Sequence, residues 1–234
     1  MKKLLITFIL VLSVTCAMAA EKKPIKAVDP DALTNEIQVI AKGAGDDHTA
    51  LVWWIPYEFW EITFARDETT SETDKKTILD TFSGVSLLSV VQADLSSLGA
   101  FTFYTREIIQ KNMVITYTDT AGKKQRLFPL QATNPDLEIL LGQFKPVLKA
   151  AMGNLGNNMH FYVLDDKSKS SLRLLDPYRE GIITIQLIKK NNDLITAEIE
   201  MPLNCLFIPR ICPNGKEAHI SWKYCPWTGT RLND

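Results

Sequence analysis

The position of the cysteines limits how this chain can be held together. Apart from Cys16, the cysteines are Cys205, Cys212 and Cys225, and all three lie within the last thirty residues of a 234-residue chain. No disulfide can cross-link the larger part of the fold, which must therefore be stabilised by a buried apolar core. Hydrophobic residues make up 46% of the sequence and charged residues 23%, which is typical of a globular protein with such a core.

The first twenty residues predict a signal peptide. Two lysines precede an apolar stretch over residues 4–14, and Ala17 and Ala19 form the A-x-A pattern that signal peptidase reads. The stretch is shorter than the roughly 20 residues that a membrane span needs. We therefore expect cleavage near Ala19 or Ala20 and a periplasmic or secreted protein, because this arrangement is typical of bacterial export.

The mature chain offers no sign of a membrane anchor or of nucleic-acid binding. The residues before Cys16 do not match a lipobox, so we do not expect a lipoprotein, and no later segment is long and apolar enough to be a transmembrane segment. Removing 20 of 234 residues leaves 214, and removing two lysines changes the formal charge from −1 to −3. A charge this small, without a basic run interleaved with aromatic residues, argues against nucleic acid as a partner.

The sequence predicts a central domain with short flanking parts. We expect a signal peptide at 1–20, a flexible leader at 21–30, a domain at 31–204 and a tail at 205–234. The leader is charged and contains two prolines, and the tail contains all the cysteines of the mature chain.

The domain is predicted to be α+β, with a mixed, mainly antiparallel sheet and several helices. About seven strands and four or five helices follow one another without a regular βαβ order. The clearest strands are 182–190 and 194–202, which form a hairpin. The clearest helix begins at Pro135, carries an apolar stripe on one face, and should be kinked or split by Pro146.

No catalytic motif is present, and the protein is not expected to be an enzyme with a recognisable active site. The best catalytic candidate is His160, which shares a strand face with Tyr162 and precedes Asp165 and Asp166. These residues, together with the acidic loop at 46–48, define the alternative of a hydrolase with a dispersed site. A half-buried histidine with a structural role is the other interpretation of His160.

The segment "WWIPYEFW" concentrates three of the five tryptophans, Trp53, Trp54 and Trp60. An exposed cluster of this kind is a binding platform for sugars or peptides, because large aromatic surfaces give affinity. A buried one is the densest part of the core. The apolar surroundings favour the core, and both interpretations remain open.

Residues 212–232 resemble a zinc ribbon that has lost two of its four ligands. A zinc ribbon has two knuckles of the form C-P-x-C-G, each supplying two thiolates to a tetrahedral zinc ion. The first knuckle here reads "CPNGK" and lacks its second cysteine, and in "YCPWTGTRL" Thr228 stands where a ligand belongs. The resemblance implies a structural or docking tail.

Three interpretations of the tail cysteines follow from this resemblance. In the first, Cys212 and Cys225 form a disulfide, since facing knuckles bring their leading cysteines together and an exported protein meets oxidising conditions. In the second, Cys205 and His219 complete a Cys₃His zinc site with them. In the third, the ribbon is vestigial and the thiols are free or pair otherwise. The first interpretation implies no cofactor, and the second implies zinc.

The chain as a whole resembles a family of uncharacterised secreted bacterial proteins with similar "WWIPYEFW" and "GNNMHFYV" segments and a cysteine-poor ribbon tail. This resemblance implies export and no particular activity. We therefore predict an exported binding or interaction module whose partner is an unknown protein or small molecule, with the hydrolase as the alternative.

Overall fold

The computed structural model describes residues 20–167 and 173–232. The predicted signal peptide, including Cys16, therefore lies outside the described residues except for Ala20. The described part is an α+β fold, as the sequence predicts. No helix in these two ranges is long and apolar enough to cross a membrane.

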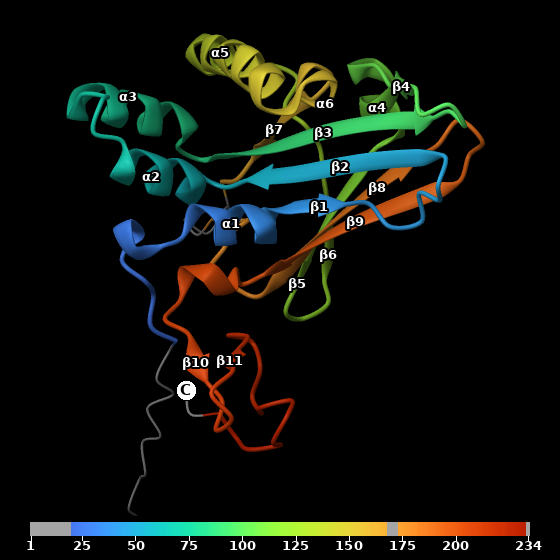
Figure 1. The fold of residues 1–234 in the computed structure, drawn as a ribbon. Helices are drawn as coiled ribbons and strands as arrows, with labels where there is room; N and C mark the ends of the chain where they lie inside the picture. Colours follow the sequence, from blue (N-terminus) through green and yellow to red (C-terminus); the bar gives the residue numbers. More distant parts are fainter. Residues whose placement is uncertain (1–19, 168–172, 233–234) are drawn as a thin grey trace, which may run out of the picture.

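The first sheet is antiparallel and has β3 at its centre. One edge of β3 pairs with β2, which in turn pairs with β1 (Figure 1). The other edge of β3 pairs with β7 along the first half of β3 and with β4 at the end of β3. The strands are β1 (Gln38–Ile40), β2 (His48–Ile55), β3 (Val85–Leu95), β4 (Phe101–Phe103) and β7 (His160–Asp165).

The second sheet is also antiparallel and has the order β6-β5-β8-β9. Its strands are β5 (Val114–Asp119), β6 (Lys124–Leu127), β8 (Gly181–Ile188) and β9 (Leu194–Met201). Burial alternates along β8, which indicates that one face of this sheet is covered and the other faces solvent. The predicted hairpin of residues 182–190 and 194–202 is confirmed as β8 and β9.

The two sheets pack face to face and are joined at both edges. An isolated bridge pairs Lys42 with Thr196, and another pairs Pro129 with Leu164. The main apolar core lies between the sheets, because inward-facing side chains of both contribute to one cluster. This closure leaves few unpaired strand edges in the described part of the chain.

Helices cover the outer face of the first sheet. Figure 1 shows α5 beside β7 and β3, and α2 and α3 near the end of β2 and the start of β3. A second apolar cluster packs these helices against the strands. The helices are α1 (Pro30–Ile37), α2 (Tyr57–Arg66), α3 (Glu72–Phe82), α4 (Arg106–Asn112), α5 (Pro135–Met152) and α6 (Asn154–Asn157), with 3₁₀ turns η1 (Ile25–Ala27) and η2 (Asn204–Leu206).

Helix α5 departs from its prediction in two ways. It continues through Pro146 as one segment, so the predicted split is wrong. Its apolar stripe covers the sheet only partly: Leu137 is fully buried, whereas Leu141 and Phe144 are half-buried. The helix therefore lies loosely over the edge of the sheet, and this position opens the space described below.

The segment predicted as a flexible leader is part of the folded body. The N–H of Lys23 donates to the carbonyl of Leu206, and the N–H of Ile208 donates to that of Glu21. Val28 is fully buried in the main core. Residues 21–23 therefore pair with residues 206–208, and the segment predicted as a flexible leader at 21–30 is held in the fold by this pairing and by the burial of Val28.

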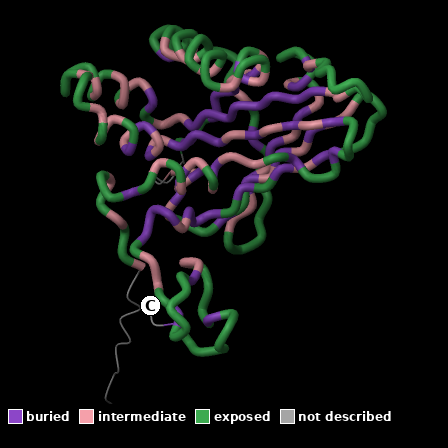
Figure 2. Tube along the Cα trace, viewed as in Figure 1, coloured by how far each residue is buried: buried purple, intermediate pink, exposed green. Residues whose placement is uncertain are grey.

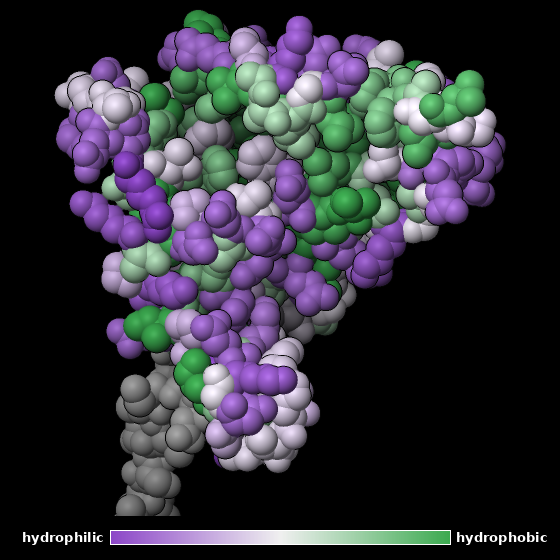
Figure 3. Space-filling view, viewed as in Figure 1, coloured by the Kyte–Doolittle hydropathy of each residue, from purple (hydrophilic) through white to green (hydrophobic). Residues whose placement is uncertain are grey.

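The tail is a small unit with a minimal core of its own. The predicted boundary at residue 205 lies too early, because Cys205 belongs to the main core between the sheets. The tail proper contains the hairpin of β10 (Arg210–Ile211) and β11 (Glu217–Ala218). Figure 2 shows most of its length exposed, and Figure 3 shows mainly pale and hydrophilic residues on the face in view. Its buried cluster consists of Cys212, Ala218, Cys225 and Leu232.

Candidate functional site

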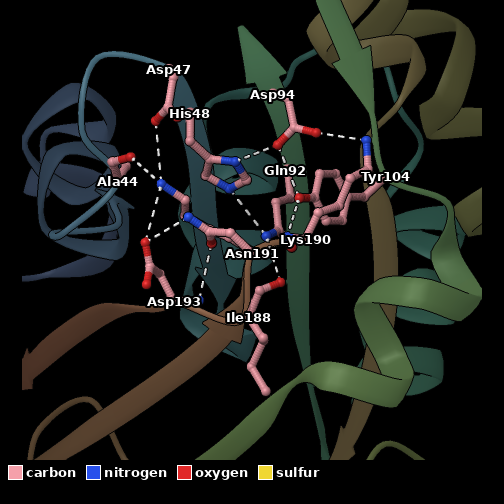
Figure 4. Close-up of polar contacts among 11 residues, drawn as sticks. Ala44, Asp47, His48, Gln92, Asp94, Tyr104, Ile188, Lys190, Asn191 and Asp193 are labelled. Atoms are coloured by element: carbon pink, nitrogen blue, oxygen red, sulfur yellow. Dashed lines mark hydrogen bonds and ion pairs between the residues drawn. The ribbon is translucent and has the colours of Figure 1, made fainter.

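His48 lies in a buried polar network between the two sheets (Figure 4). Its Nδ1 lies 2.8 Å from Asp94 Oδ1, and its Nε2 lies 3.1 Å from Gln92 Nε2. Because the Gln92 amide nitrogen is a donor, His48 Nε2 accepts, and Nδ1 carries the proton that faces Asp94. Gln92 also donates to the carbonyl of Ile188, at the end of β8.

The network ties the β8–β9 hairpin to the first sheet. Lys190 Nζ lies 2.6 Å from Asp94 Oδ2, and the N–H of Lys190 donates to the hydroxyl of Tyr104. The same hydroxyl donates to Asp94 Oδ1 at 2.9 Å. Both ring nitrogens of His48 have partners and its side chain is fully buried, so this arrangement is structural.

The aromatic segment belongs largely to the core. Trp54 is fully buried and Trp60 is 5% exposed, stacked on Phe82 with centroids 4.2 Å apart. Trp53 is half-buried and makes an edge contact with Phe59. The segment is therefore not an exposed platform, and the predicted binding role of Trp53, Trp54 and Trp60 finds no open aromatic surface there.

His160 lines a pocket of about 300 Å³ at the outer edge of β7, which we call the edge pocket. Its walls come from β7, from the segment that follows β6, from α5 and from the start of α4. Met159, Phe161 and Val163 form its apolar floor together with Leu130. The sequence marked His160 as a catalytic candidate, and the structure places it in the lining of this pocket.

The alternation of side chains along β7 shows how the pocket is placed. Phe161 and Val163 project to the helix-covered face of the sheet, whereas His160 projects to the opposite face. The pocket is lined by side chains from both faces of the sheet, so it lies at the edge of β7. On this edge, among the described residues, only Pro129 and Leu130 pair with β7, opposite Leu164 and Val163. The edge beside residues 160–161 is therefore left to the pocket.

Two cationic side chains converge on the edge pocket. Arg106, at the start of α4, and Lys145, on α5, both line it, and neither forms an ion pair with a carboxylate in the described part of the chain. Burial lowers the pKa of His160, and the positive charges of Lys145 and Arg106 lower it further. This end of the pocket therefore holds two cations beside a histidine whose charged form is disfavoured.

Helix α5 contributes one wall through four residues on a single face. Glu138, Leu141, Gly142 and Lys145 follow helical spacing and all line the pocket. Glu138 Oε1 accepts a hydrogen bond from Thr133 Oγ1 at 2.8 Å. A Cβ at Gly142 would meet no atom within 4 Å, so the absence of a side chain there keeps this part of the wall open.

The carboxylates predicted to assist His160 lie elsewhere. His160 Nε2 contacts the carbonyl of Tyr104 at 3.3 Å. Asp166 is six residues further along an extended strand, on the order of 20 Å away at roughly 3.3 Å per residue. It accepts hydrogen bonds from Arg173 Nε at 2.8 Å and from the N–H of Leu175 at 2.6 Å. Asp166 therefore belongs to a separate buried ion cluster.

That cluster joins the end of β7 to α2. Arg173 pairs with Asp166 and with Glu58, both of which are nearly fully buried. Burial raises the pKa of Asp166, although the charge of Arg173 and the hydrogen bonds oppose this effect. Since one cation compensates two carboxylates inside the fold, the cluster has a structural role, and the sequence gives no local signal for it.

Cys212 and Cys225 meet in the tail as free thiols. Burial and the contact with Cys225 raise the pKa of Cys212 to about 11. Burial also acts to raise the pKa of Cys225, but hydrogen bonds from Cys212, from Thr228 and from the N–H of Trp227 lower it to about 7. The two facing turns therefore hold two thiols of different acidity in contact, and Thr228 contacts the Cys225 sulfur from the position of a missing ligand.

The four residues of the predicted Cys₃His zinc site are not brought together. Cys205 lies in the main core, where burial and the neighbouring Glu36 raise its pKa to about 12. His219 Nδ1 lies 2.7 Å from Ser221 Oγ. In residues 20–167 and 173–232, no group of three or more Cys, His, Asp or Glu side chains is arranged to hold a metal ion.

Sequence reasoning missed most of the edge pocket. Nothing in the local sequence marks Arg106 or Lys145, because the pocket is formed by segments far apart in the chain. One available signal was Gly142, a glycine inside a predicted helix four residues before Pro146.

Comparisons with family models, with curated protein sequences and with solved structures returned no match.

Proposed function

We propose that this protein is an exported binding module that holds a small ligand, or a short segment of a partner, in the edge pocket. The observation that carries the proposal is a preformed hollow with an apolar floor and two cationic side chains that form no ion pair with a carboxylate of the described residues. Ligand sites are typically concave and mostly apolar, with a few polar groups that fix orientation. Export rests on the predicted signal peptide.

Binding is better supported than hydrolysis. A hydrolase built on His160 needs a carboxylate that orients the ring, as well as a nucleophile or an activated water. The ring contacts a main-chain carbonyl instead, and Asp166 is held by Arg173. These contacts are those of a pocket-lining side chain and not those of an oriented catalytic base.

The proposal is tested with the fluorescent probe 1-anilinonaphthalene-8-sulfonate, which combines an apolar body with an anionic group. Gly142→Trp places a large side chain in the open wall, whereas Gly142→Ala adds one methyl group to the same helix position. We expect the tryptophan variant to bind the probe at least tenfold more weakly than the native mature protein. The alanine variant should stay within about twofold.

The alanine variant is a matched control, because replacing glycine inside a helix stabilises it by about 0.5–1 kcal/mol without filling the pocket. Far-UV circular dichroism of both variants checks that the fold is kept. Equal probe affinity in the native protein and in a folded Gly142→Trp variant would refute the edge pocket as the binding site.

The same proposal gives the tail a supporting role, with Cys212 and Cys225 joined as a disulfide after export. A unit of about 25 residues with four buried side chains is too small to hold its shape by hydrophobic burial alone. The two thiols already contact each other in facing turns. A disulfide there would fix a ribbon-like tail that needs no zinc.

A further inference from the structure

We propose that the ligand of the edge pocket is a peptide with a free C-terminal carboxylate, bound in extended form along the open edge of β7. This inference rests on the proposed function and specifies its ligand class. Three features of the pocket support it, namely its paired cations, its strand edge and its apolar floor.

The cations approach the strand edge from both faces of the sheet. Lys145 comes from α5, which covers one face, and Arg106 lies near the side chains of the opposite face. Tyr162 holds Arg106 in place, since its hydroxyl donates to the Arg106 carbonyl at 3.1 Å and its ring lies 5.4 Å from the guanidinium. A guanidinium and an ammonium that flank one edge fit a terminal carboxylate through charge-assisted hydrogen bonds.

The strand edge offers main-chain groups to an extended partner. Residues 129–130 pair with β7 only as far as Val163, and no strand of the described residues continues this pairing beside residues 160–161. A peptide added here would extend the sheet in the mode of β-strand addition, in which main-chain hydrogen bonds give affinity and pockets give specificity.

The apolar floor accepts a side chain near the end of the peptide. Leu130 is 40% exposed, and Phe161 and Leu141 are half-buried although all three are apolar. A volume of about 300 Å³ is at the small end of the range for ligand sites, roughly 300–1,000 Å³. It suits the last two or three residues of a peptide with an apolar terminal side chain.

The test compares two peptides that differ in one group. Acetyl-Ala-Ala-Val-Phe with a free carboxylate and the same peptide as a C-terminal amide are titrated into the mature protein by isothermal calorimetry. We expect the free acid to bind at least tenfold more tightly than the amide. Arg106→Gln and Lys145→Gln should each reduce this ratio, because each removes one cation from the carboxylate.

Lys149→Gln is the matched control, since it removes an exposed positive charge from the same helix one turn beyond the pocket. It should leave the ratio unchanged. Hydrogen exchange of the native protein with the free acid should show added protection of the Phe161 N–H, which faces the open edge while those of His160 and Tyr162 face β3. A ligand that only fills the floor would not produce this protection.

Two results would overturn carboxylate capture. One is equal affinity for the acid and the amide, and the other is an affinity ratio that neither Arg106→Gln nor Lys145→Gln reduces. The proposed function is judged separately by the fluorescent probe. If Gly142→Trp abolishes probe binding but neither peptide displaces the probe from the native protein, the peptide inference fails and the binding pocket stands. If Gly142→Trp changes neither probe nor peptide binding, both fail.

Discussion

At the scale of single residues, buried polar side chains in this protein join elements that are distant in the chain. His48 and Asp94 connect the first sheet to the β8–β9 hairpin, and Arg173 connects β7 to α2. Asp94 has partners on β2 and on the β8–β9 hairpin, and Arg173 donates to both Asp166 and Glu58. The sequence marked the loop with His48 and the carboxylate of Asp166 as chemically interesting. Their distant partners could not be read from it, because Asp94 lies 46 residues from His48 and Ser86 lies 80 residues from Asp166.

Asp94→Asn should make the protein less sensitive to acid. Burial raises the pKa of Asp94, but hydrogen bonds from Lys190, His48 and Tyr104 outweigh it and hold the pKa below its ordinary value. A lowered pKa gives stability that is present above the ordinary value, about 3.9, and is lost as the pH falls through the lower folded value.

At neutral pH we expect Asp94→Asn to reduce the free energy of unfolding by about 1–3 kcal/mol, because Lys190 and His48 lose a charged partner. Urea titrations followed by circular dichroism at about pH 6 and about pH 3 measure the free energy of unfolding. Between these pH values it should fall less in the variant than in the native protein. Asp46→Asn, at an exposed loop position, is the control. An equal loss in the native protein and in Asp94→Asn would contradict this account.

At the scale of elements, the sequence predicted what local pattern and caps determine. Ser71 accepts a hydrogen bond from the N–H of Asp74 at the start of α3, and a serine three residues before an acidic residue is a local pattern typical of such a cap. Local patterns are less informative after Pro30, where α1 ends at Ile37 and the chain continues directly as β1. Pairing of β1 with β2 outweighs helical periodicity there, and tertiary pairing of this kind cannot be read from a local window.

Helix α4 was not predicted, and α5 was assigned to a core that it only partly reaches. A helix of seven residues, capped by Thr105, carries too little periodicity to be recognised. The stripe on α5 predicts a buried face but not how far the sheet extends beneath it. The edge pocket results from this limited overlap, so it was the part of the candidate site least accessible to sequence reasoning.

At the scale of the whole molecule, the body and the small tail are stabilised differently. The body has a core that spans both sheets and includes Cys205, whereas the tail has four buried side chains, two of which are Cys212 and Cys225. The grouping of the cysteines near the end of the sequence pointed to a separate tail, although Cys205 lies in the body. The closure of the two sheets by pairing of Lys42 with Thr196 was not predictable, because it joins positions 154 residues apart.

We expect the mature protein purified from an oxidising compartment to weigh two hydrogens less than the reduced protein, with the bond mapped to Cys212 and Cys225. Closing a loop of about 14 residues contributes about 3 kcal/mol in the chain-entropy model. Reduction should change the fluorescence of Trp222 and Trp227 but leave the far-UV circular dichroism of the body unchanged.

Intact mass spectrometry measures this difference directly. Cys225→Ser should abolish it, and Cys205→Ser, in the main core, should preserve it. A native mass that is heavier by one zinc ion, with the thiols reduced, would contradict the disulfide and favour a metal-bound tail.

The most direct test of the central claim is to locate the binding site by nuclear magnetic resonance. The isotopically labelled mature protein is titrated with 1-anilinonaphthalene-8-sulfonate, and backbone shifts are followed in the native protein and in Gly142→Trp. Binding in the edge pocket predicts native shifts concentrated at 130–133, 138–145 and 159–161, and their loss in the variant. Shifts concentrated in the tail or between α2 and α3, unchanged by Gly142→Trp, would contradict it.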